Sequence, residues 1–265
     1  MKSVLISGAA SGIGKATKEY FINNGYFVIA IDINKVEEEH ENVINLRCDI
    51  TNIYDILAVN KYLTDNNIKL DAIINIAGIH KIASFIESDY NDFKNVINVN
   101  LLGTINVNKT LYPSLKSDGR IIIVTSEVAS LDPLPFNGLY NVSKTALDSY
   151  AQSLRQELNL LNQKVITIRP GAIKTPLSDN SLVDIDNLAN ETKLYNKQAK
   201  KFLSISKKFM GTPLNPNKLA KLIYKVTNKK HPKYIYNIHR NIGLVLLSIL
   251  PKRLQCYIIK LLLNH

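Results

Sequence analysis

Short apolar runs, rich in Val, Ile and Leu, alternate with longer helix-periodic stretches over the first 170 residues. Strands that are apolar throughout belong to a parallel sheet with helices on both faces. Right-handed crossovers between such strands give a doubly wound α/β sheet, which is the fold class we predict. The predicted strands are 4–6, 27–31, 43–46, 70–74, 120–124 and 165–168, and the longest predicted helices lie within 92–115 and 139–162.

The pattern changes after Pro176. Residues 177–216 are polar, rich in lysine and irregular, so we expect a mobile substrate loop there. With 265 residues and no linker, we expect a single domain, 1–240, followed by an apolar, basic C-terminal extension, 241–265. The remaining expected elements are a helix at 217–227, a strand at 233–236 and helical segments at 242–250 and 252–263.

Charge is divided unevenly along the chain. The net charge is +11, but residues 192–265 hold 16 Lys and Arg and no Asp or Glu, while residues 1–191 hold 17 basic and 22 acidic groups. This asymmetry indicates an anionic partner for the C-terminal quarter, or else a solvated basic surface. Together with the apolar segments, it predicts peripheral association with an anionic membrane; the alternative is that the extension covers a pocket or a subunit contact. We do not expect nucleic acid as a partner.

Cysteine and histidine are too sparse to form a disulfide framework or a metal site. Cys48 and Cys256 lack ligand spacing, and so do the five histidines, so no metal is predicted. We expect no secretory signal, and no apolar run reaches the roughly 18–20 residues of a membrane span. These features predict a cytoplasmic protein, soluble or peripheral to a membrane.

A glycine-rich turn, Gly8 to Gly14, follows the first predicted strand and opens a helix. Glycines there let the backbone approach a pyrophosphate, whose charge lies at the helix N-terminus; a tight turn without a ligand is the alternative. Asp32 ends the second strand, where a carboxylate accepts ribose hydroxyls and repels a 2′-phosphate. No basic residue stands at Ser11 or Ile33, so NAD is favoured over NADP.

Tyr140 and Lys144 are one helical turn apart and share a helix face. A tyrosine hydroxyl has a pKa near 10, and a neighbouring ammonium favours its ionised form. The pair therefore predicts a proton donor or acceptor that works near neutral pH. Taken alone, the same spacing also describes an ordinary surface pair.

The motifs that bear on chemistry are, in chain order, the glycine turn, Asp32, Asn75-Ile76-Ala77-Gly78, Asn98-Val99-Asn100, Ser126, Tyr140 with Lys144, and Arg169-Pro170-Gly171. Taken together, they resemble the short-chain dehydrogenase/reductase family, in the family's order and at about its distances. The resemblance covers essentially the whole chain and is weakest in 177–216. It implies that residues 1–240 form a Rossmann-type single domain that binds a dinucleotide and is catalytic, with a C-terminal helical extension.

The resemblance implies a role for each matching residue. Tyr140 resembles the catalytic acid/base, Lys144 the residue that lowers its pKa and binds the nicotinamide ribose, and Asn100 the asparagine that holds a proton-relay water. Asp49 is similar to the residue that reads the adenine amino group. The expected cofactor-binding residues are Gly8, Ser11, Gly12, Ile13, Gly14, Asp32, Asp49, Ile50, Asn75, Ala77, Gly78, Tyr140, Lys144, Pro170, Gly171, Ile173 and Thr175.

Two positions depart from the family pattern. Ile76 stands where the family has a second asparagine, so one polar contact is lost. The family's substrate-orienting serine lies 13 residues before the tyrosine, where this chain has Glu127. Ser126, one residue earlier, is the preferred candidate for that role, and Ser130 is the fallback.

The resemblance implies a homodimeric or homotetrameric NAD-dependent oxidoreductase that transfers a hydride between NAD(H) and a hydroxyl or carbonyl group. The apolar C-terminal segments and a similarity to steroid- and retinol-type members favour a lipophilic substrate. One alternative is an NADP-linked reductase of a polar substrate. The other is a non-catalytic dinucleotide sensor or scaffold, against which Tyr140 and Lys144 argue.

Overall fold

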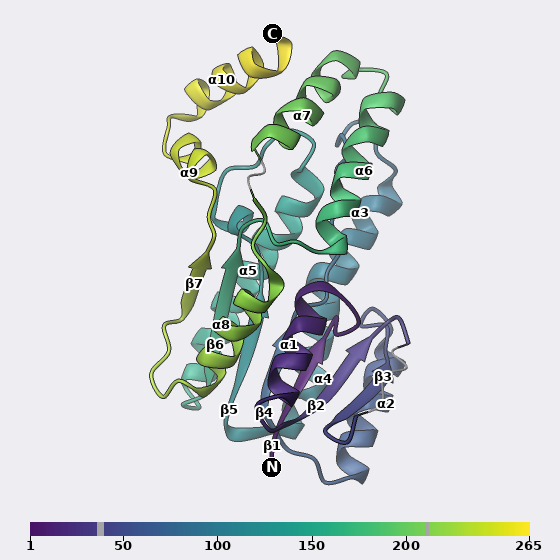
Figure 1. The fold of residues 1–265 in the computed structure, drawn as a ribbon, viewed down its shortest axis with the longest axis vertical. Helices are drawn as coiled ribbons and strands as arrows, with labels where there is room; N and C mark the ends of the chain where they lie inside the picture. Colours follow the sequence, from purple (N-terminus) through teal and green to yellow (C-terminus); the bar gives the residue numbers. More distant parts are fainter. Residues whose placement is uncertain (36–39, 210–211) are drawn as a thin grey trace.

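The computed structural model describes residues 1–35, 40–209 and 212–265. Within these residues, a seven-stranded sheet has the order β3-β2-β1-β4-β5-β6-β7, and all neighbouring strands are parallel. The predicted doubly wound fold is confirmed (Figure 1). The strands are β1 (Lys2–Ser7), β2 (Tyr26–Asp32), β3 (Val43–Arg47), β4 (Leu70–Asn75), β5 (Leu115–Val124), β6 (Lys164–Pro170) and β7 (Ile235–Ile238).

Helices cover both faces of this sheet and extend beyond the carboxyl ends of its strands (Figure 1). The α-helices are α1 (Gly12–Ile22), α2 (Ile53–Asp65), α3 (Tyr90–Ile97), α4 (Thr104–Leu111), α5 (Gly138–Asn159), α6 (Pro176–Glu191), α7 (Asn196–Phe209), α8 (Pro216–Asn228), α9 (Ile242–Ser248) and α10 (Lys252–Asn264). A π-helical turn, Asn98–Gly103, joins α3 to α4.

The interior strand β1 is buried on both sides. Successive side chains of a strand point to opposite faces of the sheet. Leu5 packs with apolar side chains of α2, α4 and α5, whereas Val4 and Ile6 pack with those of α1 and α8. All three are fully buried. Because both faces of the strand are buried, its sequence is a continuous apolar run.

Residues 177–216 were predicted to be an irregular loop, but their described part forms all of α7 and all of α6 except its first residue, so the irregular structure predicted there was wrong. Thr175 caps α6: its Oγ1 accepts from the backbone N–H of Ser178 at 3.4 Å, and its own N–H donates to Ser178 Oγ at 3.1 Å. The helical periodicity is faint in the sequence because few apolar residues, such as Phe202 in α7, face inward among many lysines.

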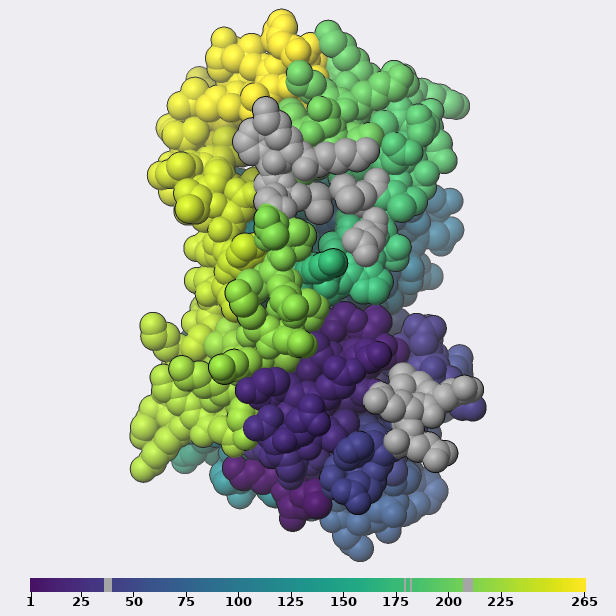
Figure 2. Space-filling view, viewed as in Figure 1, coloured from purple at the N-terminus to yellow at the C-terminus, as the bar shows by residue number. Residues whose placement is uncertain are grey.

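The end of the molecule beyond the carboxyl ends of the strands contains a third apolar cluster. Ile82, Ile185 of α6, Phe202 of α7 and Leu263 of α10 form its buried centre. The predicted C-terminal helices are present as α9 and α10, seen as the yellow surface at the upper end of Figure 2. In the described part of the chain, no helix has the length and apolar character needed to cross a membrane.

The strand order reverses direction between β1 and β4, because β1 continues to β2 on one side and β4 to β5 on the other. In open α/β sheets, ligands bind in the crevice at the carboxyl ends of the strands at such a point. The fold therefore predicts a ligand-binding site at the segments that follow β1 and β4.

Candidate active site

A cleft of about 450 Å³ opens beyond the carboxyl ends of β1, β2 and β4. Most of the predicted cofactor residues line it, namely Gly8, Ser11, Gly12, Ile13, Gly14, Asp32, Asp49, Ile50, Ala77, Gly78 and Thr175. Lining residues that were not predicted to bind the cofactor are Ile33, Asn34, Cys48, Ile76, Ile79, Val99, Pro176, Leu177 and Asn180.

The glycine turn depends on the absence of side chains. Gly8 and Gly12 have left-handed backbones, with φ of +71° and +52°. A Cβ at Gly8 would lie 2.7 Å from the Cα of Ala77, and one at Gly14 would lie 1.8 Å from the carbonyl oxygen of Gly8. Ser11, the N-cap of α1, makes no side-chain cap hydrogen bond. The N–H groups of the first helical turn are thus available to an anion, as a dinucleotide pyrophosphate requires.

A second helix begins beside this turn. A Cβ at Gly12 would lie 3.0 Å from Cγ2 of Thr175, the N-cap of α6. The partially positive N-termini of α1 and α6 therefore meet at the wall of the cleft, where both favour a bound anion. The sequence missed this feature because it predicted no helix at Pro176.

Two carboxylates lie in the part of the cleft that follows β2 and β3. Asp32 accepts from the N–H of Ala10 at 3.0 Å and from that of Asn34 at 2.9 Å, one bond to each oxygen. Asp49 accepts from the N–H of Thr51 at 2.8 Å. Carboxylate oxygens have further lone pairs, so both groups are able to accept from ligand hydroxyl or amino groups while they repel a phosphate. Both carboxylates therefore offer acceptors to a dinucleotide bound in the cleft.

Six predicted cofactor residues lie outside the described lining of this cleft: Tyr140 and Lys144, described below, and Asn75, Pro170, Gly171 and Ile173. Asn75 is buried, and its Nδ2 donates to Asn108 Oδ1 at 2.8 Å. Gly171 packs so closely on β7 that a Cβ would lie 1.9 Å from the carbonyl oxygen of His239. Ile173 pairs with Leu214 in an isolated bridge. In this structure these residues hold neighbouring segments together.

Tyr140 and Lys144 lie in the first two turns of α5, and both side chains are buried. The Nζ of Lys144 lies 5.8 Å from the centre of the Tyr140 ring and donates to the carbonyl oxygen of Val124 at 3.4 Å. The same Nζ would lie 3.3 Å from a Cβ at Gly78, so it sits against a wall of the cleft. The predicted pair is thus next to the dinucleotide cleft.

Burial shifts the pKa of both groups toward their neutral forms. It raises the pKa of Tyr140 to about 12, against the smaller opposing effect of a hydrogen bond with Ser126, and it lowers the pKa of Lys144 to about 8. The sequence predicted a lowered tyrosine pKa. That prediction counted the neighbouring ammonium but not the loss of water around both side chains.

Ser126, not Glu127, faces the tyrosine. The Ser126 hydroxyl is hydrogen-bonded to the Tyr140 phenol and also accepts from the N–H of Val128 at 3.4 Å. The buried Glu127 points the other way, and its Oε2 accepts from the N–H of Asn241 at 2.7 Å. Ser130 lies beside Arg240, whose Nη2 donates to Ser130 Oγ at 3.4 Å. Of the two candidate serines, Ser126 is therefore the one that lies beside the phenol of Tyr140.

Asn100 lies in the π-helical turn, a distortion often found at functional sites. Its Oδ1 accepts from the N–H of Ile79 at 2.8 Å, and its Nδ2 donates to the carbonyl oxygen of Ile79 and to Ser143 Oγ, both at 2.9 Å. Ser143 Oγ in turn donates to the carbonyl oxygen of Tyr140 at 2.7 Å. Asn100 thus joins the segment after β4 to the helix of Tyr140.

His80 is a site residue that the sequence analysis did not assign. Its ring packs edge to face on the Tyr140 ring, with centroids 4.2 Å apart. Its Nε2 lies 3.0 Å from Asn137 Oδ1 and its Nδ1 lies 2.7 Å from Ser181 Oγ in α6. The available signal was its position, two residues after Gly78 and therefore just past the end of β4.

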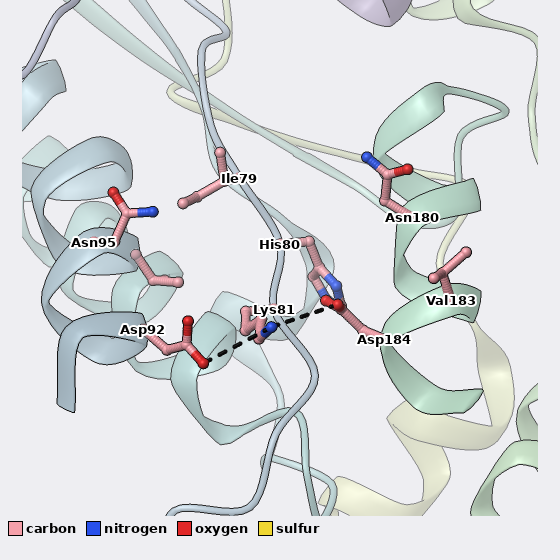
Figure 3. Close-up of a pocket in the computed structure, with 9 residues that line it drawn as sticks. Ile79, His80, Lys81, Asp92, Asn95, Asn180, Val183 and Asp184 are labelled. Carbon is pink, nitrogen blue, oxygen red and sulfur yellow. Dashed lines mark ion pairs between the residues drawn. The ribbon is translucent and has the colours of Figure 1, made fainter. Parts of the chain in front are cut away.

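A second, polar cavity of about 350 Å³ lies beside His80, between α3 and α6 (Figure 3). Lys81 stands between Asp92 and Asp184, 3.8 and 3.7 Å from the nearest oxygen of each. Ile79 and Asn180 line both this cavity and the dinucleotide cleft. The two spaces are therefore adjacent, and His80 lies between the polar cavity and Tyr140.

The fold and cleft define an α/β protein built to bind a dinucleotide beside a buried tyrosine. The family model for short chain dehydrogenase matches residues 2–185. A 3-ketodihydrosphingosine reductase of Bacteroides thetaiotaomicron is 27% identical over 233 residues, covering 87% of this chain and 85% of that protein. A 3-amino-tetrahydro-pyrrolizinone reductase of Xenorhabdus hominickii is 29% identical over 248 residues, covering 89% and 86%.

A solved structure of a short chain dehydrogenase family protein from Francisella tularensis superposes with a TM-score of 0.75 at 27% identity, covering 90% of this chain and 97% of that one. The chain belongs to the short-chain dehydrogenase/reductase family, as its motifs predicted. It is therefore an oxidoreductase of a family that uses a nicotinamide dinucleotide and small-molecule substrates and whose members are commonly oligomeric.

The half-buried His80 predicts a pH-dependent stability. Burial lowers its pKa to about 4, against about 6.5 in an unfolded chain. Because the unfolded state then binds the proton more readily, the contribution of His80 is complete above about pH 6.5 and is lost as the pH falls toward 4. Urea unfolding across this range should show the wild type losing about 1–3 kcal/mol more than His80→Gln, which does not titrate. Parallel pH curves for the two proteins would contradict the prediction.

Proposed function

We propose that the protein transfers a hydride between NAD(H) and a hydroxyl or carbonyl group, with Tyr140 as the acid/base. The observation that carries this proposal is the buried phenol of Tyr140, hydrogen-bonded to Ser126 and placed with Lys144 beside a dinucleotide cleft. When bound, the nicotinamide supplies or accepts the hydride. The chain's own residues supply the proton and the orientation.

Each of these residues has a separate task. The Ser126 hydroxyl holds the substrate oxygen, and Tyr140 gives that oxygen a proton during reduction or removes one during oxidation. The Lys144 ammonium stabilises the phenolate that forms when Tyr140 loses its proton, because buried charges interact strongly. Asn100 acts through the backbone of Ile79, and a proton-relay water is the role that the resemblance implies for it.

For the cofactor we propose NAD in preference to NADP. Asp32 and Asp49 line the cleft, and Ile33, the residue after Asp32, is apolar and 53% exposed. A 2′-phosphate would meet a carboxylate, and no Lys or Arg is among the described residues that line the cleft. The paired N-termini of α1 and α6 supply the positive end of the site at the pyrophosphate.

For the substrate we propose a lipophilic compound. Phe136, four residues before Tyr140, packs edge to face on Tyr195 and Phe202, with centroids 5.5 Å away in each case. This apolar wall continues into the third cluster. The 3-ketodihydrosphingosine reductase among the relatives is consistent with a lipid-like substrate. The polar cavity around Lys81 favours the second candidate, a polar carbonyl compound.

We propose further that the protein is a cytoplasmic homodimer or homotetramer. Members of the family are commonly oligomeric, which supports this proposal. The sequence also predicts peripheral association with an anionic membrane, and that prediction depends on which faces α9 and α10 turn to solvent.

Removal of the phenol should test the function directly. Tyr140→Phe should lower kcat about 10²–10⁴-fold because it removes only the proton-transfer group, and it should leave the Kd for NAD nearly unchanged. The measurement is turnover with NAD and a panel of steroid, retinoid, aliphatic and polar alcohols, with NAD affinity measured separately. A protein that binds NAD but converts no alcohol or ketone in either direction would be the non-catalytic sensor instead.

Ser126 and Glu127 form a matched pair for testing the orienting residue. Ser126→Ala should lower kcat about 10²-fold, the usual effect of losing one donor to the reacting oxygen. Glu127→Gln should change kcat little, because Glu127 bonds to Asn241 and not to Tyr140. If the glutamine variant lost activity while the alanine variant kept it, the orienting role would belong to position 127.

Cofactor choice should depend on the charge of Asp32. We expect kcat/KM to be at least about tenfold higher with NAD than with NADP, equivalent to about 1.4 kcal/mol. Asp32→Asn keeps a hydrogen-bonding oxygen while removing the charge, so it should reduce this ratio. Adding Ile33→Arg should reverse it. Equal kcat/KM with both cofactors in the wild type would refute the argument.

A further inference from the structure

The solvent-facing sides of α9 and α10 are apolar. In α9 and at its C-cap, Ile242, Leu246 and Ile249 recur at helical spacing and are 57–74% exposed. In α10, Leu254, Tyr257 and Leu261 follow the same spacing and are 39–59% exposed. A surface helix of a globular protein normally turns its apolar stripe inward and its polar residues outward. Both tail helices depart from that arrangement.

The opposite face of α10 holds the tail to the body, which fixes the direction of the apolar face. Gln255 is buried, and its Nε2 donates to Asp132 Oδ2 at 2.8 Å. Leu263 is buried in the third apolar cluster, against α6 and α7. The N–H of Asp132 donates to Oγ of Ser248, the last residue of α9, at 3.0 Å. Both tail helices are therefore fixed to the body, and we call their six exposed apolar residues the tail face.

Basic residues accompany the tail face. Arg253 and Lys260 are exposed on α10 beside Leu254 and Leu261. The whole stretch 192–265 has 16 basic and no acidic residues. A second copy of this chain would bring an equally basic surface against it, and like charges oppose such a contact. An anionic lipid surface complements both the charge and the apolar side chains.

We propose that the tail face docks on an anionic bilayer, with its apolar side chains at the headgroup boundary and Arg253 and Lys260 against lipid phosphates. This attachment does not depend on the reaction catalysed. The third apolar cluster lies between α10 and the Phe136 wall near Tyr140, so docking also brings lipid to the substrate side of the site. Entry of substrate from the bilayer is a consequence that rests on the proposed function.

Vesicle binding by the full-length protein tests the docking without reference to activity. The wild type should sediment with vesicles of phosphatidylcholine and phosphatidylglycerol, weakly with phosphatidylcholine alone, and less in high salt. Arg253→Gln with Lys260→Gln should lower the partition coefficient about 30-fold, equivalent to about 2 kcal/mol at about 1 kcal/mol for each basic residue. Leu246→Gln with Ile249→Gln should lower it at least about tenfold.

Two control proteins separate the tail face from charge and exposed apolar area in general. Lys61→Gln with Lys109→Gln removes the same charge from α2 and α4, and Leu160→Gln replaces an apolar residue that is 82% exposed at the end of α5. Both should bind anionic vesicles like the wild type. Circular dichroism should show that every variant is folded.

Three results would overturn the proposal. The first is a wild type that does not bind anionic vesicles. The second is tail-face variants that bind them as well as the wild type does. The third is tail-face variants that lose an oligomer in sedimentation velocity without a change in vesicle binding, which would make the tail face a subunit contact.

Discussion

The geometry of the site depends on one amide side chain. Asn100 is hydrogen-bonded to both the N–H and the carbonyl oxygen of Ile79. These two bonds hold the segment that follows β4 in place. This arrangement keeps Gly78 and Ile79 on the cleft wall and places the ring of His80 against Tyr140. The π-helical turn, which adds a residue to the helix between α3 and α4, provides the backbone from which this amide makes its bonds. A regular helix would direct the side chain elsewhere.

The site also shows what burial costs and what it provides. Tyr140 and Lys144 are held out of water, which makes their charged forms unfavourable and raises one pKa while lowering the other. The surrounding polar atoms offset this cost: Ser126 bonds to the phenol and the carbonyl oxygen of Val124 accepts from the ammonium. Because few water molecules surround it, charge that develops on the phenol interacts strongly with the nearby ammonium. Stability and proton transfer thus place opposing demands on the same residues.

The sequence predicted the sheet well because a strand buried on both faces leaves little choice of residue. The segments that end at Ser7, Asp32 and Asn75 are apolar runs for that reason, and the residues just after them form the cleft. Helices α6 and α7 were not predicted, because their packing depends on partners far along the chain, such as Leu263. The direction of the Tyr140 pKa shift depends on burial, which local spacing does not reveal. The sequence favoured Ser126 over Glu127, but the partners that separate the two residues, Tyr140 and Asn241, lie in different parts of the fold.

The buried bond between Glu127 and Asn241 makes the C-terminal tail part of the folding unit that contains Ser126. A chain that ended before Asn241 would leave a buried carboxylate without its donor, directly beside the orienting serine. The segment 126–132 and the tail therefore form a single structural unit. A chimaera that takes its tail from a relative would need the matching 126–132 segment from the same relative.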